Sequence, residues 1–487
     1  MLARRLATFR REEAAERVLS GGHVPRPSAA GSGRHRSMEL ANRLAAALDA
    51  EVVVTPHGSI VRVETGARAL PLDREALARL PGQPPADVSL VCLDTETTGL
   101  ATAAGTVAFL VGLGWWEGIR FRQVQLLLPD QPDEPALLDL LASMIPSHSW
   151  LVTYNGRGFD WPLLVARFRM ARRDAPPHAG HLDLLATVRR LFRHRMADAR
   201  LRTAEETLLG MLRVDDVEGW EIPGRYLHFL RGGDPLPLVP VVQHNDRDVH
   251  SLARLLAHLA DELGDHDRRR LAPDGDLLGL ARTFQREGRL EEALQCLDTA
   301  VQRPPRPAGS LRAAAMARPG ATLGSAGAIT SRPAVAPSAW LVDRTDDIRL
   351  AIAQLSQARS GRLTRDQLAR ERARLLRRLG RHDEARHAWQ TLAASSGPLA
   401  AIAYVELAKV LEHIDRDFPA ALDAVSAADR LVARSAAAGP LPGLLSDLGR
   451  RRARLVRRAA GGSAQVVAPA ETRARQTHAL AHTLPDG

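Results

Sequence analysis

The 487-residue sequence predicts an α/β domain in the middle of the chain and an all-α region after it. Large aromatic side chains dominate core burial, and 13 of the 19 aromatic residues lie within residues 91–260. In the same stretch, short apolar runs lead into helical periods, as strand–helix units do. Beyond residue 275 the pattern changes to paired helical segments, which are typical of helical repeats.

The chain carries a formal charge of +10, from 66 basic and 56 acidic residues. A positive charge favours an anionic partner such as a nucleic acid. Residues 91–260 hold 18 basic and 20 acidic residues, a net charge of −2, so the excess positive charge lies outside the α/β domain. Only one basic residue, Lys409, is a lysine, so a compositional bias toward arginine explains the charge equally well.

The composition excludes several classes of protein. Two cysteines, Cys92 and Cys296, cannot form a disulfide framework or a four-cysteine zinc site. Cys92 lies in an apolar run and is expected to be buried. We find no run of about 18 apolar residues that predicts a transmembrane helix, and residues 1–20 lack the apolar segment of a signal peptide. We therefore expect a reduced, cytoplasmic setting.

Residues 1–87 are expected to form an N-terminal extension that is partly flexible. Residues 21–37 are rich in Gly, Pro, Ser and Arg, which predicts a flexible link. A helical period follows over residues 39–50. Two runs, 51–54 and 60–64, flank a Pro-His-Gly turn and predict a β-hairpin.

The predicted α/β domain, residues 88–262, opens with an apolar run that ends in two acids. Asp94 and Glu96 stand two positions apart, so in a strand their carboxylates point to the same face. Two such acids repel each other unless a cation lies between them, and Mg²⁺ or Mn²⁺ prefers oxygen ligands. Ordinary solvated acids at a strand end are the alternative interpretation.

A second motif occupies residues 150–164, with the sequence WLVTYNGRGFDWPLL. Its apolar start predicts a strand, Gly156 and Gly158 predict a loop, and Pro162 suits the first turn of a helix. Asp160 would then either cap that helix or direct its carboxylate toward the same site as the first two acids. The two glycines would let a phosphate or a base approach the backbone.

The third motif opens a helix near residue 241. His244 and Asp248 are four residues apart and so share one helical face. A lone His–Asp pair is most often a surface contact, so its significance depends on the other two motifs. A strand followed by a helix near residue 183 adds His181 and Asp183, which are more often packing or capping groups than site residues.

Together the motifs resemble the DEDD exonuclease superfamily of the ribonuclease H-like fold, over roughly residues 88–260. The four acids of that superfamily correspond to Asp94, Glu96, Asp160 and Asp248. Other segments are similar to its YprB-type branch: Asp-Thr-Glu-Thr-Thr-Gly-Leu at 94–100, Gly105-Thr106, Phe109-Leu110-Val111-Gly112, His181-Leu182-Asp183-Leu184-Leu185 and His244-Asn245.

The resemblance implies a mixed sheet flanked by helices and a 3′–5′ exonuclease acting on DNA or RNA. The four acids would hold two Mg²⁺ or Mn²⁺ ions ~4 Å apart, one activating a water and the other stabilising the leaving 3′ oxygen. His244 would accept or orient the proton of that water. A nucleic-acid-binding scaffold without activity, or a structure-specific endonuclease, are the alternatives.

The position of His244 departs from the superfamily pattern. The His-type branch places its histidine five residues before the last acid, and the Tyr-type branch places a tyrosine four residues before it. Here a histidine stands four residues before Asp248, in the tyrosine register. His244 is therefore either a general base or only a residue that positions water.

Five residues are weaker candidates for contacts with the nucleic acid, which is expected to present a single-stranded 3′ end. Asn155 would hold the terminal nucleotide and Phe159 would stack on it. Loop hydrogen bonding and core packing are their alternative roles. The other three candidates are Thr95, Thr97 and Asp183.

Three helical pairs predict a tetratricopeptide-like region over residues 272–302 and 341–460. Equivalent alanines in the second and third pairs, Ala385 and Ala421, are 36 residues apart, close to the tetratricopeptide period of about 34. Members of the YprB-type branch often carry such helices after the nuclease domain. Helical repeats of this kind would recruit a protein partner; an amphipathic bundle without true repeats is the alternative.

Two stretches rich in Pro, Ala, Gly and Ser, residues 303–340 and 461–487, predict a disordered linker and a disordered tail. Arginines are dense at 268–270 and at 450–458. They would bind a phosphate backbone, or they would form solvated helix faces in an arginine-rich chain.

Overall fold

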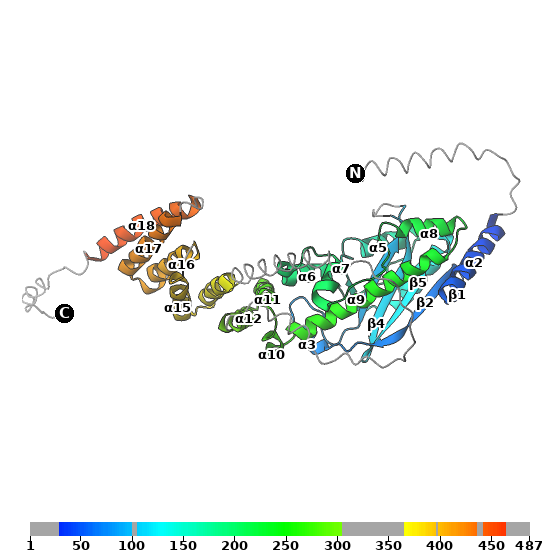
Figure 1. Ribbon diagram of the computed structural model, residues 1–487, viewed down its shortest axis with the longest axis horizontal. Helices are drawn as coiled ribbons and strands as arrows, with labels where there is room; N and C mark the ends of the chain where they lie inside the picture. Colours follow the sequence, from blue (N-terminus) through cyan, green and yellow to red (C-terminus); the bar gives the residue numbers. More distant parts are fainter. Residues whose placement is uncertain (1–28, 100–104, 304–364, 396–397, 436–441, 464–487) are drawn as a thin grey trace, which may run out of the picture. The chain divides into compact units, whose positions relative to one another are not determined.

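The structure is a computed structural model that describes residues 29–99, 105–303, 365–395, 398–435 and 442–463 (Figure 1). Its contacts divide the chain into two compact units. Within the described residues, unit 1 comprises residues 29–78, 82–99, 105–187 and 198–260, and unit 2 comprises residues 79–81, 188–197, 261–303, 365–395, 398–435 and 442–463.

Unit 1 is built on a seven-stranded mixed sheet with the strand order β1-β2-β5-β4-β3-β6-β7. The first five strands in this order pair antiparallel, whereas β3, β6 and β7 pair parallel. The mixed sheet and the N-terminal hairpin are confirmed. The strands are β1 (Glu51–Thr55), β2 (Gly58–Ala69), β3 (Leu90–Thr97), β4 (Ala108–Glu117), β5 (Arg120–Leu127), β6 (Trp150–Thr153) and β7 (Gly180–Asp183).

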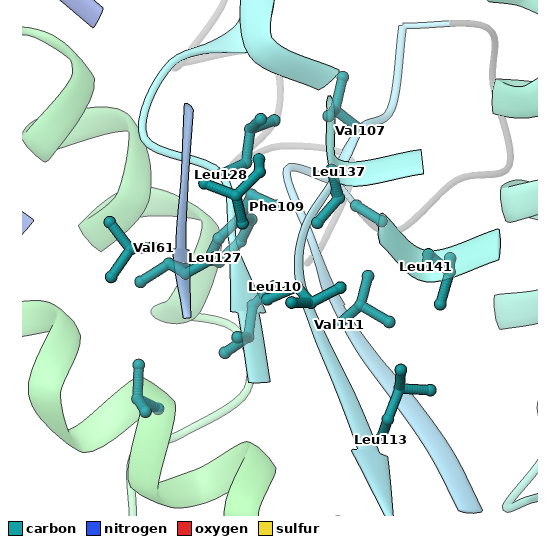
Figure 2. Packing of buried hydrophobic residues seen from close by; sticks show 14 of the residues in the cluster. Val61, Val107, Phe109, Leu110, Val111, Leu113, Leu127, Leu128, Leu137 and Leu141 are labelled. Carbon is teal, nitrogen blue, oxygen red and sulfur yellow. The ribbon is translucent and has the colours of Figure 1, made fainter. Parts of the chain in front are cut away.

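Helices flank this sheet (Figure 1). The helices that lie wholly or partly in unit 1 are α2 (Ala29–Leu48), α3 (Arg74–Ala78), α4 (Glu134–Met144), α5 (Asp160–Met170), α6 (Leu184–Phe192), α7 (Leu201–Ala204), α8 (Ile222–Leu230) and α9 (Val239–Leu263). The main core cluster joins apolar side chains of β3, β4 and β5 to Leu137 and Leu141 of α4 (Figure 2). Cys92 is fully buried, as predicted.

Helix α9 approaches the sheet where two strand residues have no side chain. A Cβ atom at Gly112 would lie 2.2 Å from Asn245 Oδ1, and one at Gly114 would lie 2.9 Å from Val249 Cγ1. Such distances are far shorter than van der Waals contact, so any larger residue would push α9 away from β4. The two glycines therefore set how closely α9 lies on the face of the sheet that carries Asp94, the partner of Gly112.

Two expectations for the N-terminal segment need correction. Residues 29–37 belong to helix α2, so the predicted flexible link does not extend over them. Leu40 and Leu44 of that helix are buried in the sheet's core, which stabilises the helix from its C-terminal half. Strands β1 and β2 are part of the same sheet, so the domain does not begin at residue 88.

Unit 2 is helical. Glycines with positive φ, Gly288 (+78°) and Gly380 (+75°), separate the helices of the first two predicted pairs. The helical pairs are confirmed, while their membership of the tetratricopeptide class stays a prediction. The helices are α10 (His266–Arg269), α11 (Asp274–Arg286), α12 (Leu290–Gln302), residues 365–378, α15 (His382–Ala393), α16 (Pro398–Val410), α17 (Phe418–Ser435) and α18 (Pro442–Ser463).

Part of the arginine-rich C-terminal helix has a structural role. The side chain of Glu412 is fully buried, and Arg451 and Arg454 of α18 bind its carboxylate at 2.7 and 2.6 Å. These two arginines are therefore committed to an ion pair inside unit 2, which favours the structural interpretation for them. Residues 461–463 are helical, whereas the rest of the predicted tail and nearly all of the predicted linker lie outside the described residues.

No helix in the described ranges combines the length and the apolar character needed to span a membrane.

Candidate active site

The pairing of β3 places the first two acids. Its antiparallel partner β4 follows it as far as Thr97, whereas the parallel partner β6 pairs only with Leu90, Val91 and Cys92. The C-terminal half of β3 therefore extends beyond its parallel neighbour. Asp94 and Glu96 lie there on one face of the strand, as their spacing predicts.

Asp160 reaches the same edge from the next strand. Strand β6 ends at Thr153, and a loop leads into α5, which begins at Asp160. Thr95 Oγ1 donates a hydrogen bond to Asp160 Oδ1 at 2.5 Å, which ties the carboxylate to β3. The N-cap residue of α5 is Phe159, without a side-chain cap, so the capping interpretation of Asp160 is wrong.

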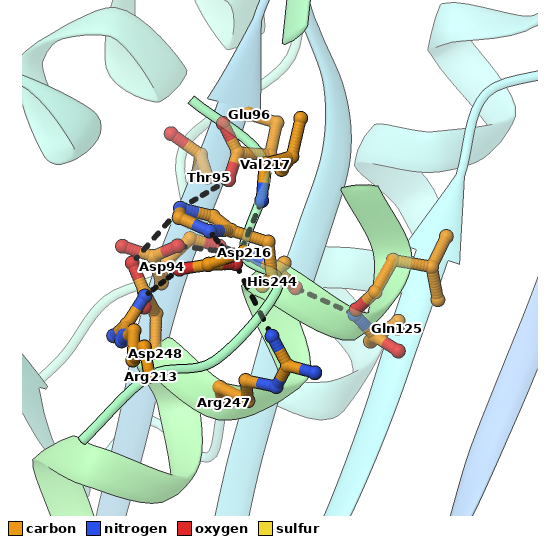
Figure 3. Close-up of polar contacts among 12 residues, drawn as sticks. Asp94, Thr95, Glu96, Gln125, Arg213, Asp216, Val217, His244, Arg247 and Asp248 are labelled. Atoms are coloured by element: carbon orange, nitrogen blue, oxygen red, sulfur yellow. Dashed lines mark hydrogen bonds and ion pairs between the residues drawn. The ribbon is translucent and has the colours of Figure 1, made fainter. Parts of the chain in front are cut away.

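Helix α9 brings the third motif to this edge (Figure 3). His244 Nε2 lies 3.6 Å from Asp248 Oδ2 and 4.0 Å from Glu96 Oε1. Both distances exceed that of a hydrogen bond. The two residues, one helical turn apart, therefore face the acids of β3, and the pair is more than a surface contact.

The four acids form one electrostatic cluster. Burial raises the pKa of Asp94 well above its usual range, and the charges of Asp248, Asp160 and Glu96 raise it further. Burial is also the first cause of the raised pKa of Glu96, followed by the charges of Asp248 and Asp160. The pKa values of Asp160 and Asp248 are likewise raised, first by burial. Burial therefore opposes ionisation of all four acids, and for Asp94 and Glu96 the charges of neighbouring acids oppose it further.

The chemistry of this donor set suits hard divalent cations, which prefer carboxylate oxygens. In the described part of the chain, however, no group of three or more His, Cys, Asp or Glu side chains is arranged to hold a metal ion. One oxygen each of Asp94, Asp160 and Asp248 instead accepts a hydrogen bond, from Asn245, Thr95 and Arg213 respectively. Binding of a cation by these acids would therefore require their side chains to rearrange.

Asn245 is a site residue to which the sequence assigned no role. It is fully buried, and its Nδ2 donates to Asp94 Oδ2 at 2.9 Å. Gln125 Nε2 donates to Asn245 Oδ1 at 2.9 Å and so fixes the orientation of the amide. The missing side chain of Gly112 provides the space for this contact. Gly112 and Asn245 stand in segments that resemble the YprB-type branch, but no sequence pattern indicates that the two residues contact each other.

Arg213 is a second site residue that sequence reasoning missed. Its side chain is 7% exposed, and its Nε and Nη2 bind Glu205 in a fork with both distances 2.6 Å. Nη1 donates to Asp216 Oδ2 at 2.9 Å, and Nη2 also donates to Asp248. Burial is the largest single influence and opposes its charge, but the hydrogen bonds to Glu205 and Asp216 and the charges of Asp248 and Glu205 together outweigh it and raise the pKa of Arg213.

Asp216 connects this arginine to His244 (Figure 3). His244 Nδ1 lies 2.8 Å from Asp216 Oδ1. Burial alone would raise the pKa of Asp216, but the hydrogen bonds from Arg213 and His244 lower it. Neither Arg213 nor Asp216 belongs to a recognisable motif, so the sequence offered only charged residues in a loop.

The weaker candidates divide between the site and its supporting loop. Asp183 accepts hydrogen bonds from the backbone amides of Asn155 and Leu185 at 2.8 and 3.0 Å, so it holds the loop before α5. Thr97 Oγ1 donates to the carbonyl of Gly99 within its own turn.

Asn155, Phe159 and His181 differ in their surroundings. Asn155 adopts φ = 69° in this loop, a conformation that asparagine tolerates well. Phe159 is 52% exposed, so its core-packing alternative is wrong and its ring is free to contact a ligand. His181 is buried, which lowers its pKa to about 4, and its Nε2 lies 2.8 Å from Thr153 Oγ1.

We expect neutralisation of Asp94 to stabilise the metal-free protein at high pH. Folding raises the pKa of Asp94, so the folded state binds more protons than the unfolded state. The stability of the protein therefore falls as the pH rises from the pKa of the unfolded state through that of the folded state. Each tenfold change in proton affinity corresponds to about 1.4 kcal/mol. In EDTA, Asp94→Asn should therefore have a higher melting temperature than wild type at pH 8.

The difference in melting temperature should shrink as the pH is lowered from 8 to 5, because the wild-type carboxyl gains its proton as the pH falls. A constant difference across this range, or a less stable variant at pH 8, would contradict the electrostatic cluster. Measuring the difference between two proteins removes the contribution of groups elsewhere in the chain that titrate in both.

Comparison with known proteins agrees with this architecture. Residues 91–260 match the family model of the RNase H superfamily. Over 219 residues, the chain is 35% identical to the uncharacterized protein YprB of Bacillus subtilis (strain 168). That similarity covers 44% of this chain and 52% of the relative, so the chain spans about half the length of the relative it matches. The chain therefore contains a domain of the RNase H superfamily, whose family model matches residues 91–260.

Proposed function

We propose that this protein is a metal-dependent nuclease that hydrolyses phosphodiester bonds of DNA or RNA as a 3′–5′ exonuclease. One observation carries the proposal: Asp94, Glu96, Asp160 and Asp248 converge from β3, α5 and α9, where the charges of Asp160 and Asp248 raise the pKa of both Asp94 and Glu96. Such buried like charges are costly in a purely structural role. The same carboxylates would be stabilised by bound cations, which would in turn bind the phosphate of an anionic substrate.

Two bound Mg²⁺ or Mn²⁺ ions would supply a more acidic water and a counter-charge for the phosphate and the leaving oxygen. The four carboxylates would hold these ions, with Asn245 and Thr95 orienting Asp94 and Asp160. His244 Nε2, which faces the carboxylates, would accept or orient the proton of the attacking water.

The exposed ring of Phe159 next to Asp160 suits stacking against a terminal base. Stacking tolerates any base, and an unpaired base is the one that can reach such a ring. A single-stranded 3′ end is therefore the substrate that we propose. Asn155, earlier in the same loop and held there by the hydrogen bond to Asp183, is the second candidate contact.

The test is an assay of the purified full chain with Mn²⁺ and end-labelled single- and double-stranded DNA and RNA. We expect a ladder of mononucleotide products that starts from the 3′ end. Discrete internal products would instead identify an endonuclease. Binding without any product, at several Mn²⁺ and Mg²⁺ concentrations, would favour a nucleic-acid-binding scaffold and overturn the proposed hydrolysis.

A further inference from the structure

The loop over residues 210–217 has the reverse of the usual surface pattern, and we call it the strap. Its apolar side chains Leu212 and Val214 are 77% and 71% exposed. Two of its three charged side chains, Arg213 and Asp216, are only 7% and 8% exposed, whereas Asp215 is exposed. Burying charge while exposing apolar surface costs free energy, so the inward contacts of the strap need an explanation.

The inward contacts end on His244. Asp216 Oδ2 accepts from Arg213 Nη1 at 2.9 Å, and Arg213 is itself held by the buried carboxylate of Glu205. Asp216 Oδ1 lies 2.8 Å from His244 Nδ1 and also accepts from Arg247 Nη1 at 3.2 Å. An ionised carboxylate has no proton to donate, so the proton of this hydrogen bond belongs to His244 Nδ1.

This contact fixes the chemistry of the other ring nitrogen. With Nδ1 protonated, the neutral imidazole has its lone pair on Nε2. Nε2 faces Asp248 Oδ2 and Glu96 Oε1 at 3.6 and 4.0 Å, too far for direct hydrogen bonds. The lone pair is thus directed into the acid cluster, toward the place where an attacking water would lie.

We propose that Asp216 is a positioning residue for His244: it selects the Nδ1–H tautomer and turns the Nε2 lone pair toward the carboxylates. The proposal rests on the proposed nuclease function. It also explains how a histidine works four residues before the last acid, because the strap, and not the helix register alone, sets the direction of the ring. Arg213 and Glu205 hold Asp216 in place.

A double-mutant cycle separates this role from simple support of the loop. Asp216→Asn keeps the shape of the side chain, but its amide can donate to Nδ1 and favour the wrong tautomer. We expect kcat to fall on the order of 10²-fold or more, with KM within about twofold. In a His244→Ala background, the same substitution should cause no further fall, because its effect passes through the imidazole.

The matched control is Asp215→Asn. Asp215 is the exposed neighbour in the strap, and its φ of 55° suits asparagine as well as aspartate. It removes the same charge from the same loop, and activity should stay at the wild-type level. If Asp216→Asn lowers kcat equally with and without His244, the positioning role is overturned.

A second measurement needs no variant at Asp216 to fold. In ¹⁵N-histidine-labelled wild type with Mg²⁺ at pH 8, the ring signals lost in His244→Ala should show a protonated Nδ1 and a free Nε2. The opposite tautomer would overturn the proposal. If the wild-type protein hydrolyses no nucleic acid, the proposed function fails, while the tautomer measurement still decides the role of Asp216.

Discussion

Substitution of Asp94 by alanine or of Asp160 by asparagine is expected to abolish Mn²⁺-dependent release of nucleotides while the fold survives. Each change removes one of the four carboxylates that would hold the cations. Charge stabilisation by such ions contributes several kcal/mol to a transition state, and each 1.4 kcal/mol is about tenfold in rate. We therefore expect a loss of at least ~10³-fold in kcat.

The fold should survive because the remaining contacts of each site persist. In the Asp160→Asn variant, Thr95 can still donate to the side-chain amide oxygen, since an amide oxygen accepts as a carboxylate does. Mn²⁺ should raise the melting temperature of wild type but not of the variants. Asp174→Asn, an exposed acid just after α5, is the control and should behave as wild type. Equal hydrolysis by all four proteins would remove the site assignment.

Replacement of Arg213 by methionine is expected to destabilise unit 1 by ~3–5 kcal/mol, the usual cost of breaking a buried ion pair from one side. The side chain of Glu205 is 1% exposed, and Asp216 is 8% exposed, so neither can turn to water for compensation. The substitution also removes the hydrogen bond that Asp248 accepts from Arg213, together with a positive charge beside the four acids.

Urea unfolding followed by tryptophan fluorescence measures this effect, since five of the seven tryptophans lie in the sequence of unit 1. Arg202→Met is the matched control, because Arg202 pairs with Glu206, the neighbour of Glu205, at the surface with 54% and 39% exposure. That pair should contribute only about 0–1 kcal/mol. Equal destabilisation by both substitutions would show that burial of Arg213 carries no special cost.

Much of the site was predictable because each of its acids stands next to a strand or helix pattern that is recognisable in the sequence. Asp94 and Glu96 follow an apolar strand, and His244 and Asp248 share a helical face, so strand and helix periodicity alone orient them. The chain resembles the DEDD superfamily over these motifs, which supplied what periodicity cannot: that four positions far apart in sequence meet at one sheet edge.

The supporting residues were not predictable for a physical reason. Glu205, Arg213 and Asp216 act through a hydrogen-bonded network that exists only after the strap has folded against α9. In the sequence they are indistinguishable from charged residues that face solvent. The sequence predicted the N-terminal strands as a hairpin. The pairing of β2 with β5 depends on contacts between segments distant in the sequence, such as Val61 with Leu127, which no local pattern records.

The contact between Asp94 on β3 and Asn245 on α9 has a consequence for folding during synthesis on the ribosome. Asp94 and Glu96 emerge early, but Asn245, which holds Asp94 in place, follows 151 residues later on α9. A ribosome adds about 5–20 residues per second, and a domain generally folds as a unit once its residues have emerged. A nascent chain that still lacks α9 therefore holds an incomplete set of carboxylates, and hydrolytic capacity would arise only once the whole domain has left the exit tunnel.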